Sequence, residues 1–584
     1  MSDQRVDWVV DTPMSSRYPI YTRGNVGEVF PDPVAPLSFD LGMRKGAEHG
    51  WRDAFVRFGV FDADEFDPDA MEILGVFGGY CYLNVSVSRI FGVRVPGLTP
   101  ELVDVTLFGE QEGIRPYEPR PTDESPEHTA RVQQTLGFIF SADDLPDLAE
   151  HAKAMDELRA ARPDLEAMTD RELVDRGRGL FDMWFRTLFA EHLFISYCAI
   201  AAAGVITSVC TAIGQPELAT KLMAGVGGVD SALPSWAMWD LGRLAASSPA
   251  LTAAFEAGPE HVLERLRADE GEEARNFIAR FDDFLYAFGS RGPNEWESRC
   301  PTWETNPELA LTAIDRMRVS PSSAAPTGHQ AALAAEREKL GPQVVESLAS
   351  DPETQAQFAA ALRASALFLA GRERTKTTVV RLVHEGRMMM HELGRRMVAA
   401  GHFAEVNNFG MLRDDELTAF LDDPARFGPL IAEREARYAE LARLEPPFVL
   451  NGDLIPTSKW PVRGETEVDV AGAGDTLTGI AGCPGKAVGR ARVILDPFDG
   501  GELEPGEVLV APITDPSWTP LFVPAAAVVV DVGAQVSHAI IVSRELGLPC
   551  VVSVTEGTRR IPTGALVEVD GTNGRVTVLE APVS

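Results

Sequence analysis

Residues Ala525 to Val554 read AAAVVVDVGAQVSHAIIVSRELGLPCVVSV, and this stretch decides the fold of the C-terminal part of the chain. Its apolar start predicts a buried strand that runs toward Gly533. A helix then begins at Ser537 and ends at Gly547, and a second buried strand follows. A helix between two buried strands predicts a compact α/β arrangement.

The sequence on either side continues this pattern of short strands and turns. From residue 481 onward only one segment is clearly helical. The predicted strands are Val488–Leu495, Val508–Pro512, Ala525–Val530, Cys550–Val554, Ala565–Val569 and Arg575–Leu579, and the predicted helix is Ala539–Leu546. Residues 481–584 are therefore predicted to form a separate α/β domain.

Residues 446–480 are predicted to be a flexible linker to that domain. Pro446 and Pro447 stop the preceding helix, and the run 471–474 consists of alanine and glycine. Proline stiffens a linker, whereas glycine loosens it. The glycines do not form a nucleotide-binding loop, because no Lys-Ser/Thr pair follows them.

Residues 1–445 are predicted to be mainly helical, so the fold class is multidomain, with a helical domain followed by an α/β domain. Thr169 and Glu172 have the spacing of a capping box at a helix start. Further helices are expected at 330–340, 354–369 and 375–400, with a short one from 414 and some strands within 60–125. The proline-rich residues 21–40 are either a surface arm or an ordered loop that lines a site.

The charge balance excludes two classes of partner. The chain has 53 Lys and Arg against 87 Asp and Glu, a net charge of −34. Proteins that bind nucleic acid or anionic membranes need a basic face, so neither partner is expected. Six cysteines without a CxxC pair, and a start without a basic and apolar leader, predict a cytoplasmic protein.

The segment 193–213 is uncharged and long enough to cross a bilayer. It is rich in Ala, Ser, Thr, Gly and Cys rather than Leu, and Glu191 and His192 flank it instead of a Lys/Arg cluster. We therefore expect a buried central helix of a large core.

His538 stands at the start of the predicted helix, and this position has chemical consequences. The positive end of the helix dipole and the free N–H groups favour an anion there. The same field disfavours the imidazolium, so the ring stays neutral and nucleophilic. Such a ring suits a histidine that attacks a phosphoryl group and holds it as phosphohistidine. The alternative is a histidine that merely caps the helix.

The same stretch resembles the swivelling phosphohistidine domain of the phosphoenolpyruvate synthase and pyruvate phosphate dikinase family. The central motif matches at Ser537, His538, Ala539, Arg544, Glu545, Leu546, Gly547 and Pro549. The flanks match at Gly482, Gly485–Ala487, Thr514–Phe522 and Val569–Gly571. The resemblance implies that His538 is the phosphoryl carrier and that Ser537 helps to stabilise the phosphoryl group.

The preceding part of the chain is similar to the substrate domain of rifampin phosphotransferase, which implies that residues 1–445 hold the acceptor. The matches near the start are Asn25, Gly27, Glu28, Pro31, Pro33, Pro36 and Leu37. Residues 290–297 and 301–304 look like a Gly-His-Arg-Gly…Glu signature and supply Arg291, Glu295 and Glu297. Ser290 replaces the signature histidine, so any role of that histidine is lost here.

Residues 372–376 are similar to a basic helix of the same domain, and helix geometry supports this match independently. Arg372 and Lys376 are four residues apart and share one helical face, and Arg387 continues the basic character. We expect a phosphoryl clamp, with a solvated face paired to Glu373 as the alternative.

No metal and no tightly bound cofactor are expected. His384 and His391 share a predicted helix, but the second histidine of the zincin spacing is missing. The acceptor pocket is expected to be lined by apolar and aromatic residues, of which the helical region has more than one pocket needs. The candidates are Trp184, Phe185, Phe189, Trp236, Trp239, Phe281, Phe284, Phe288 and Met388–Met390.

The ATP-grasp domain of related dikinases is not found in this sequence. In this respect the chain resembles the large, histidine-bearing subunit of split phenol and aromatic-alcohol phosphorylating synthases, such as phenylphosphate synthase and the 4-cresol-phosphorylating enzyme. The resemblance implies a separate ATP-grasp subunit as partner, Mg-ATP supplied through it, and a small, largely apolar alcohol or phenol as acceptor.

Three alternatives stay open: a rifamycin-type antibiotic phosphotransferase component, a non-catalytic ligand-binding or regulatory carrier, and phosphoenolpyruvate synthesis itself. The last is disfavoured, because no β/α-barrel is found. The general base stays open among Glu28, Glu295, Glu297 and His384.

Overall fold

The structure is a computed structural model of the 584-residue chain. It describes residues 7–108, 113–227, 230, 233–258, 261–320, 326–465, 468–497, 503–533 and 537–582. The chain forms two compact units. The first consists of Met1–Ala202, Trp296–Cys300 and Leu367–Glu467, and the second of Ala203–Glu295, Pro301–Ala366 and Val468–Ser584.

A four-stranded antiparallel sheet lies in the first unit, with the strand order β2-β3-β1-β4. The strands are β1 (Ile20–Thr22), β2 (Leu74–Phe77), β3 (Tyr80–Asn84) and β4 (Val449–Asn451). Tyr21 in β1 is opposite Asn84 on one side and Leu450 on the other. The strands expected within 60–125 are confirmed, whereas β4 lies where a linker was predicted.

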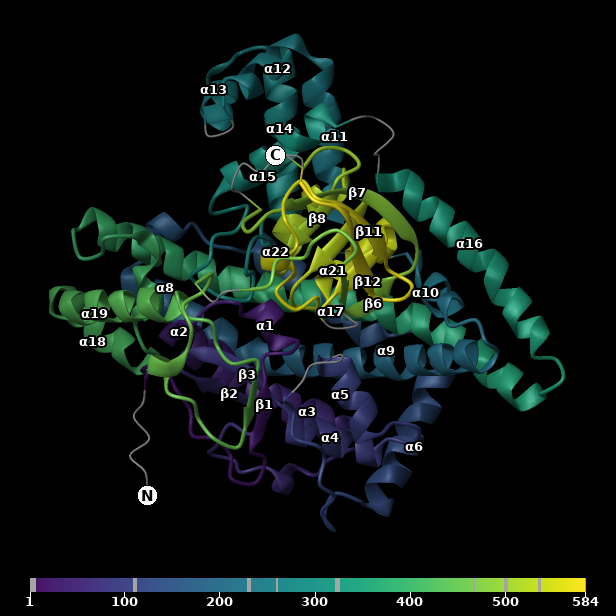
Figure 1. Ribbon diagram of the computed structural model, residues 1–584. Helices are drawn as coiled ribbons and strands as arrows, with labels where there is room; N and C mark the ends of the chain where they lie inside the picture. Colours follow the sequence, from purple (N-terminus) through teal and green to yellow (C-terminus); the bar gives the residue numbers. More distant parts are fainter. Residues whose placement is uncertain are drawn as a thin grey trace. The chain divides into compact units, whose positions relative to one another are not determined.

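Helices make up most of the first unit. The capping box at Thr169 is confirmed, since its hydroxyl accepts a hydrogen bond from the N–H of Glu172. The helices are α1 (Val26–Val29), α2 (Pro36–Ser38), α3 (Glu48–Phe58), α4 (Val85–Arg94), α5 (Pro100–Phe108), α6 (Pro126–Ser141), α7 (Pro146–Ala160), α8 (Asp170–Leu180), α18 (Leu417–Asp422) and α19 (Pro424–Ala442). Two long helices, α9 (Arg186–Ala212) and α17 (Pro352–Ala399), contribute residues to both units (Figure 1).

Helix α17 is one continuous helix of 48 residues, so the prediction of two helices at 354–369 and 375–400 was wrong. Gly371 lies in the expected break, and a glycine inside a helix costs about 1 kcal/mol relative to alanine. Its neighbours explain why the glycine is present. A Cβ at Gly371 would lie 3.0 Å from Leu145 Cδ1 and 3.1 Å from Leu148 Cδ2, so glycine permits close packing of α17 against α7.

The proline-rich residues 21–40 form an ordered, buried loop, which confirms the second alternative for this segment. Val34 and Ala35 are fully buried. The buried Arg23 guanidinium donates hydrogen bonds to the carbonyls of Cys81 (2.7 Å) and Phe30 (2.9 Å), which ties the loop to β3. The loop is thereby held as a wall of the first unit.

Two π-helical segments, Phe39–Ala47 and Phe181–Phe185, contact each other in the first unit. A Cβ at Gly46 would lie only 2.1 Å from Phe185 Cδ1, so this close approach requires glycine. A π-helical turn displaces side chains from their α-helical positions and is frequent at functional sites.

Helix α9 contains the apolar segment 193–213, and the predicted helix is confirmed. Within the described residues, one helical stretch, Asp170–Ala212, is long and apolar enough to cross a membrane. Of its most apolar window 44% is buried. Cys198, Ala202 and Ile206 are fully buried while Ile200 is 39% exposed, so the burial is one-sided rather than complete.

The helices of the second unit surround an aromatic core. Phe277, Phe281 and Phe284 on α14 stack in sequence, and Trp303 packs against Phe284 with ring centroids 5.5 Å apart. The helices are α10 (Glu217–Met223), α11 (Leu233–Ser247), α12 (Pro249–Glu256), α13 (Val262–Ala268), α14 (Glu272–Phe288), α15 (Pro307–Val319) and α16 (Pro326–Ser347).

The second unit also holds an eight-stranded mixed sheet with the order β5-β12-β11-β7-β8-β9-β10-β6. Its central strands β7, β8, β9 and β10 run parallel. The strands are β5 (Thr476–Thr478), β6 (Ile480–Cys483), β7 (Lys486–Val493), β8 (Val508–Ala511), β9 (Ala527–Val530), β10 (Cys550–Val552), β11 (Leu566–Asp570) and β12 (Arg575–Glu580). Short helices α20 (Thr519–Phe522), α21 (His538–Leu546) and α22 (Gly557–Arg560) connect them.

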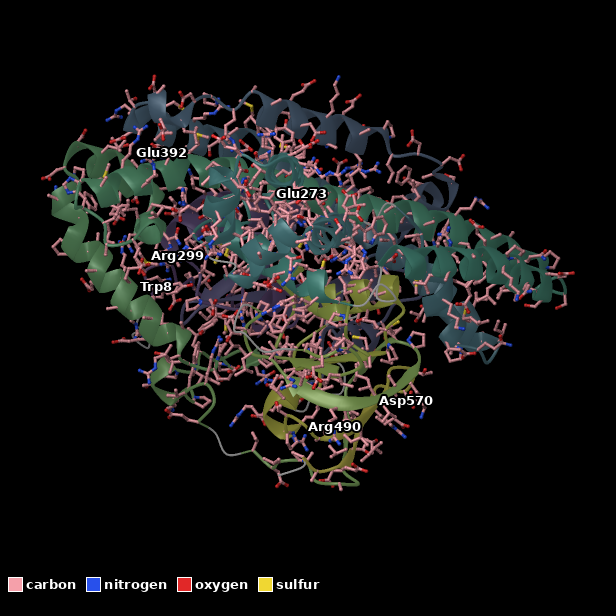
Figure 2. The ribbon with its side chains drawn as sticks, turned by 90° about the horizontal axis from the view of Figure 1, so that it is seen from above. Trp8, Glu273, Arg299, Glu392, Arg490 and Asp570 are labelled. Carbon is pink, nitrogen blue, oxygen red and sulfur yellow. The ribbon has the colours of Figure 1, made fainter. Side chains whose placement is uncertain are left out.

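All six predicted strands and the predicted helix of this domain are confirmed. Alternating residues of the parallel strands enter two different cores: Leu509 and Val528 pack toward α21, whereas Val508 and Val529 pack toward β11 and β12. Burial on both faces explains the uninterrupted apolar runs. On its other side β7 pairs antiparallel with β11, and Arg490 and Asp570 lie on these two strands (Figure 2).

The two compact units group the chain differently from the predicted segments 1–445, 446–480 and 481–584, and these boundaries stay predictions. Residues 203–295 and 301–366 pack with the C-terminal sheet. Strands β4 and β5 lie inside the predicted linker. The longest stretch there without a helix, strand or bridge is 463–475, of which 466–467 lie outside the described residues.

Candidate active site

His538 lies where the carboxyl ends of two parallel strands meet. Strand β9 ends at Val530, and α21 begins at His538, while Thr514 follows the end of the neighbouring strand β8. Loops at the carboxyl ends of parallel strands are the usual place for ligands in α/β folds. The helix start predicted for His538 is confirmed.

Threonine hydroxyls hold the half-buried His538 ring on both of its nitrogens. Nδ1 lies 3.2 Å from Thr514 Oγ1, and Nε2 lies 3.2 Å from Thr519 Oγ1. Phe522 packs edge-on against the ring with centroids 5.9 Å apart. A hydroxyl both donates and accepts, so this pair suits a neutral imidazole with one protonated and one unprotonated nitrogen. A nitrogen with a lone pair is what a nucleophilic histidine needs.

Ser537 is the N-cap of α21. It is buried, and its hydroxyl accepts a hydrogen bond from the N–H of Ile540 (3.4 Å). The predicted role in stabilising a phosphoryl group stays a prediction, and the structure adds a local one, since an N-cap serine stabilises a helix by about 1 kcal/mol. The start of the helix remains a favourable place for an anion.

The signature 290–295 packs beside the His538 loops within the second unit. The N–H of Asn294, whose φ of 50° is in the left-handed region, donates to Asp515 Oδ2 (3.0 Å). Asp515 also accepts a hydrogen bond from the N–H of Ser517 (2.8 Å), and burial raises the pKa of its carboxyl. Arg291 and Glu295 form a buried ion pair at 3.3 Å. Arg291 and Glu295 are thus in the same unit as His538, next to its loop.

A second site is an apolar cavity within the first unit, which we call the acceptor cavity. Its volume is about 120 Å³. The column Phe181, Phe185 and Phe189 forms one wall, with consecutive ring centroids 5.4 and 5.7 Å apart. The other lining residues are Asn25, Val26, Val29, Phe30, Leu37, Ser38, Leu41, Gly42, Met43, Ala47, Trp51, Leu74, Cys81, Gly177, His192, Leu193, Trp296, Ser298, Val383, Gly386 and Met390.

Glu297 stands behind the cavity wall rather than in it. Its carboxylate accepts hydrogen bonds from the N–H of Ala35 (3.2 Å) and from the Ser38 hydroxyl, which lies 2.6 Å from the Ser298 hydroxyl. Burial raises the pKa of Glu297. Ser38 and Ser298 line the cavity, so a chain of hydroxyls connects Glu297 to it.

Arg387, which was predicted as a site residue, holds segment 296–300 against α17. Its guanidinium donates to the carbonyls of Ser298 (3.1 Å) and Glu297 (3.0 Å) and is fully buried. Within this segment, Arg299 lies over the ring of Tyr438 on α19, and Trp8 packs edge-on against the same ring (Figure 2). Arg387 therefore shapes the cavity indirectly, through the backbone.

His192 is a histidine in the lining of the acceptor cavity. It is 8% exposed, and its Nδ1 lies 3.1 Å from Thr375 Oγ1 on α17. Burial, followed by the positive charges of Arg372 and Lys376, lowers the pKa of His192 to about 3. The predicted basic pair is thus near the cavity. Arg372 also forms the predicted alternative contact, an ion pair with Glu373 at 2.5 Å.

Only some of the other predicted residues lie at one of the two sites. Among the described residues, the cavity lining includes Asn25 but neither Glu28 nor His384. His384 is buried with its Nδ1 3.5 Å from an Arg387 nitrogen. Of the predicted aromatic lining, Phe185 and Phe189 are in the cavity wall, whereas Trp239, Phe281 and Phe284 belong to the core of the second unit.

Thr514, Thr519, His192 and Trp296 are site residues that the sequence analysis missed. The first two lie within the family-like segment 514–522, so that match was a signal for them. His192 had no comparable signal, because its partner Thr375 is 183 residues away.

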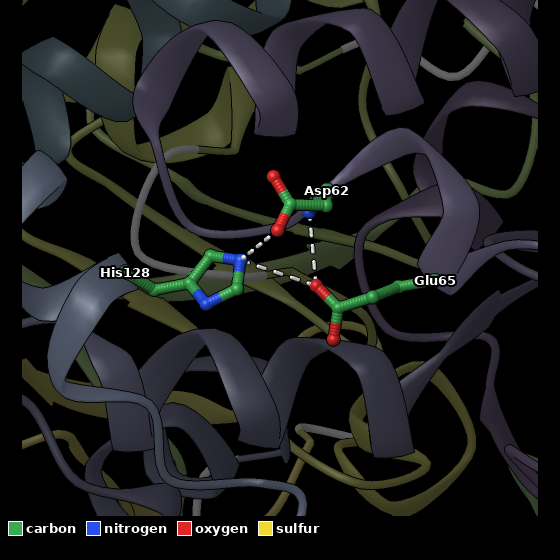
Figure 3. Close-up of side chains that lie close together, drawn as sticks. All are labelled: Asp62, Glu65 and His128. Carbon is green, nitrogen blue, oxygen red and sulfur yellow. Dashed lines mark hydrogen bonds and ion pairs between the residues drawn. The ribbon is translucent and has the colours of Figure 1, made fainter.

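Asp62, Glu65 and His128 form the only group of acidic and histidine side chains that could hold a metal ion within the described part of the chain (Figure 3). His128 Nε2 lies 3.3 Å from Asp62 and 3.2 Å from Glu65. Arg94 and Arg131 already pair with these carboxylates at 2.8 and 2.7 Å. The two guanidinium groups neutralise the acidic pair, so this cluster is explained as an ion-pair network.

Comparison with known proteins places His538 in one recognised region, and His192 at the edge of another. The family model "PEP-utilising enzyme, mobile domain" matches residues 503–574, which include His538 and both threonines. The model "Rifampicin phosphotransferase fourth domain" matches residues 191–373, which include His192 and Arg372.

Three relatives extend the likeness along the chain. An uncharacterized protein of Mycobacterium tuberculosis is 30% identical over 98% of this chain and 62% of its own length. The prodigiosin synthesizing transferase PigC of Serratia marcescens is 27% identical over 98% of this chain and 64% of its own. A rifampicin phosphotransferase of Streptomyces sviceus is 28% identical over 76% and 53%.

This chain thus spans less than two thirds of the length of these relatives. The mainly helical region and the C-terminal α/β domain are confirmed as predicted. The chain combines a PEP-utilising mobile domain with a region similar to the fourth domain of rifampicin phosphotransferase.

Proposed function

We propose that this chain is a phosphotransferase component in which His538 accepts a phosphoryl group and passes it to a hydroxyl of an apolar acceptor. The observation that carries the proposal is the His538 ring at the start of α21, held between two threonine hydroxyls. Once a phosphoryl group is bound to one ring nitrogen, the helix start and the hydroxyls offer donors to its oxygens.

The lining of the acceptor cavity supports a small, apolar acceptor. Aromatic and aliphatic side chains dominate it, and Asn25, Ser38, His192 and Ser298 supply a few polar groups. Pockets with this composition bind apolar molecules and orient them by a small number of polar contacts. An apolar cavity of about 150 Å³ is known to hold benzene. The volume of about 120 Å³ therefore favours a single-ring phenol or alcohol over a rifamycin-sized macrocycle.

The phosphoryl group originates, in this proposal, from Mg-ATP bound by a separate ATP-grasp subunit. His538 and the acceptor cavity belong to different compact units. The C-terminal domain would therefore swing between its donor and the cavity, with residues 463–475 as the connection. Arg372 and Lys376, near His192, would neutralise the phosphoryl oxygens as they arrive.

A test of the proposal does not need the ATP-using partner. Phosphoramidate phosphorylates histidine chemically, so the full chain is charged with it, and phosphohistidine is located by mass spectrometry at neutral pH. The charged protein is freed of reagent and mixed with phenol, benzyl alcohol, a rifamycin or glucose.

We expect phosphohistidine at His538 and phosphorylated phenol or benzyl alcohol as product. Phosphate on the rifamycin alone would favour the antibiotic alternative. A charged chain that transfers to none of the acceptors, or one that prefers glucose, would overturn the proposed acceptor class. Failure to charge His538 would overturn the carrier role itself.

A further inference from the structure

His192 combines three features that the proposed transfer reaction requires of a proton acceptor. It lines the acceptor cavity, it is held in one orientation, and two cationic side chains lie near it. Trp296 packs beside its ring at a centroid distance of 6.1 Å, and Phe189 lies at 6.4 Å. Aromatic side chains therefore flank the imidazole where it lines the cavity.

Thr375 fixes the protonation pattern of the ring. Its hydroxyl oxygen lies 3.0 Å from the carbonyl oxygens of Gly371 and Arg372, one turn back on α17. The hydroxyl hydrogen is used on one of these carbonyls, so the oxygen accepts a hydrogen bond from His192 Nδ1–H. A neutral histidine with its proton on Nδ1 keeps a lone pair on Nε2.

The charges near the ring change sign when a phosphoryl group arrives. In the free protein, Arg372 and Lys376 add to burial in holding the imidazole neutral. A transferring phosphoryl group carries negative charge and offsets both cations. The ring thus becomes more basic at the moment when the acceptor hydroxyl must lose its proton.

We propose that Nε2 of His192 takes the proton of the acceptor hydroxyl during phosphoryl transfer from His538; this inference rests on the proposed function. The acceptor oxygen forms a bond to phosphorus, and the phosphorus–nitrogen bond to His538 breaks. The bonding electron pair returns to the His538 ring nitrogen, and the acceptor proton moves to His192 Nε2.

The candidates considered from the sequence are less suited to this role. Both oxygens of Glu297 already accept hydrogen bonds, from Ala35, Ser38 and Arg299. Glu295 is paired with Arg291 in the second unit. Within the described residues, Glu28 and His384 are not part of the cavity lining.

The test uses acceptors of graded acidity with the variant His192→Gln. Glutamine keeps a polar side chain of similar length but does not take up a proton. His538 is charged with phosphoramidate, and transfer rates to benzyl alcohol, phenol and 4-nitrophenol are compared at neutral pH. His391→Gln on α17, outside the cavity lining, is the matched control.

We expect His192→Gln to charge normally and to lose about 100-fold in rate with benzyl alcohol, which must give up its proton during transfer. The loss should be smaller with phenol and smallest with 4-nitrophenol, which is partly ionised at neutral pH and gives up its proton most readily. An equal loss for all three acceptors, or no loss at all, would overturn the role of His192 while leaving the proposed function intact.

A second pair of variants separates base catalysis from structure. Thr375→Val removes the oxygen that fixes Nδ1–H and should reproduce the dependence on acceptor acidity in weaker form, whereas Thr375→Ser should restore the wild-type pattern. If valine and serine behave alike, Thr375 does not position the ring. If wild-type protein transfers to none of the acceptors, the proposed function fails, and this inference fails with it.

Discussion

His538 and His192 are the two histidines on which the proposed chemistry depends, and their surroundings are opposite. His538 is half-buried between two hydroxyls at a helix start, in a loop between parallel strands. His192 is buried in the lining of the acceptor cavity, where the Thr375 hydroxyl and a backbone hydrogen bond to Arg372 hold it. In the proposed reaction, the first site carries a charged group, and the second stays neutral until such a group comes near.

The comparison shows that the two steps of the proposed reaction need different electrostatic surroundings. A carrier must bind and release a charged group, so its polar partners surround the ring. For a buried proton acceptor, a surrounding without water strengthens the effect of each nearby charge on its basicity. Variants of the two sites should therefore fail at different steps.

The largest effect is expected for His538→Ala, which removes the proposed carrier. Charging by phosphoramidate at this position and all transfer should be lost, since the nucleophilic nitrogen is gone. The side chain is half-buried, so unfolding free energy should change by only about 1 kcal/mol. The measurement is phosphohistidine by mass spectrometry with a urea unfolding curve. Transfer that persists in His538→Ala would show that His538 is not the carrier.

The next effect concerns the basic pair near His192. Arg372→Met combined with Lys376→Met should slow transfer to the acceptor by about 100-fold or more while charging of His538 stays normal, because the cations act on the transferring group. Arg381→Met on the same helix, where Arg381 pairs with Asp156 at 2.7 Å, is the control. Equal losses in both variants would show a general effect on α17 and not a clamp.

A third prediction follows from the pKa of about 3 for His192. The ordinary value is about 6.5 in the unfolded chain, so below that pH the unfolded chain binds a proton that the folded chain does not. The free energy of unfolding therefore decreases as the pH falls below this value, by about 1.4 kcal/mol per pH unit. Between pH 6.5 and 5.0, wild type should lose about 1.6 kcal/mol more than His192→Gln in urea unfolding. Parallel curves for the two proteins would contradict a buried neutral imidazole.

The smallest effect is expected from narrowing the cavity. Gly42 lines it, and a Cβ at this position meets no atom within 4 Å. Gly42→Leu should raise KM for ring-bearing acceptors by about 10-fold, because contact area with the acceptor is lost. Gly179→Leu on α8, where a Cβ also meets nothing, is the control. An unchanged KM in Gly42→Leu would place the acceptor elsewhere in the unit.

The same contrast explains how much of the site could be predicted from the sequence. His538 lies in a stretch whose strands and helix follow one another along the chain, so its place could be predicted from local pattern. His192 depends on Thr375 and Trp296, which come from α17 and from a separate segment. No local pattern predicts which faces of two long helices pack together.

The differences between the predicted and the observed elements have similar physical causes. The three-residue strands β4 and β5 exist through pairing with β1 and β12, which residues 446–480 alone do not reveal. The break inside α17 was predicted from local helix preference. In the structure the helix continues through Gly371, which allows α17 to pack closely against α7. Tertiary contacts override local preference wherever an element is short or a glycine is tightly packed.

Trp296 and Trp51, which both line the acceptor cavity, also give this protein an optical reporter. Indole fluorescence responds to the polarity of its surroundings and to nearby imidazole, and Trp296 is beside His192. An aromatic molecule that enters the cavity should therefore alter the emission before any chemistry occurs. Comparing Trp296→Phe with wild type would isolate this signal from the other tryptophans and would let acceptors be screened by titration alone.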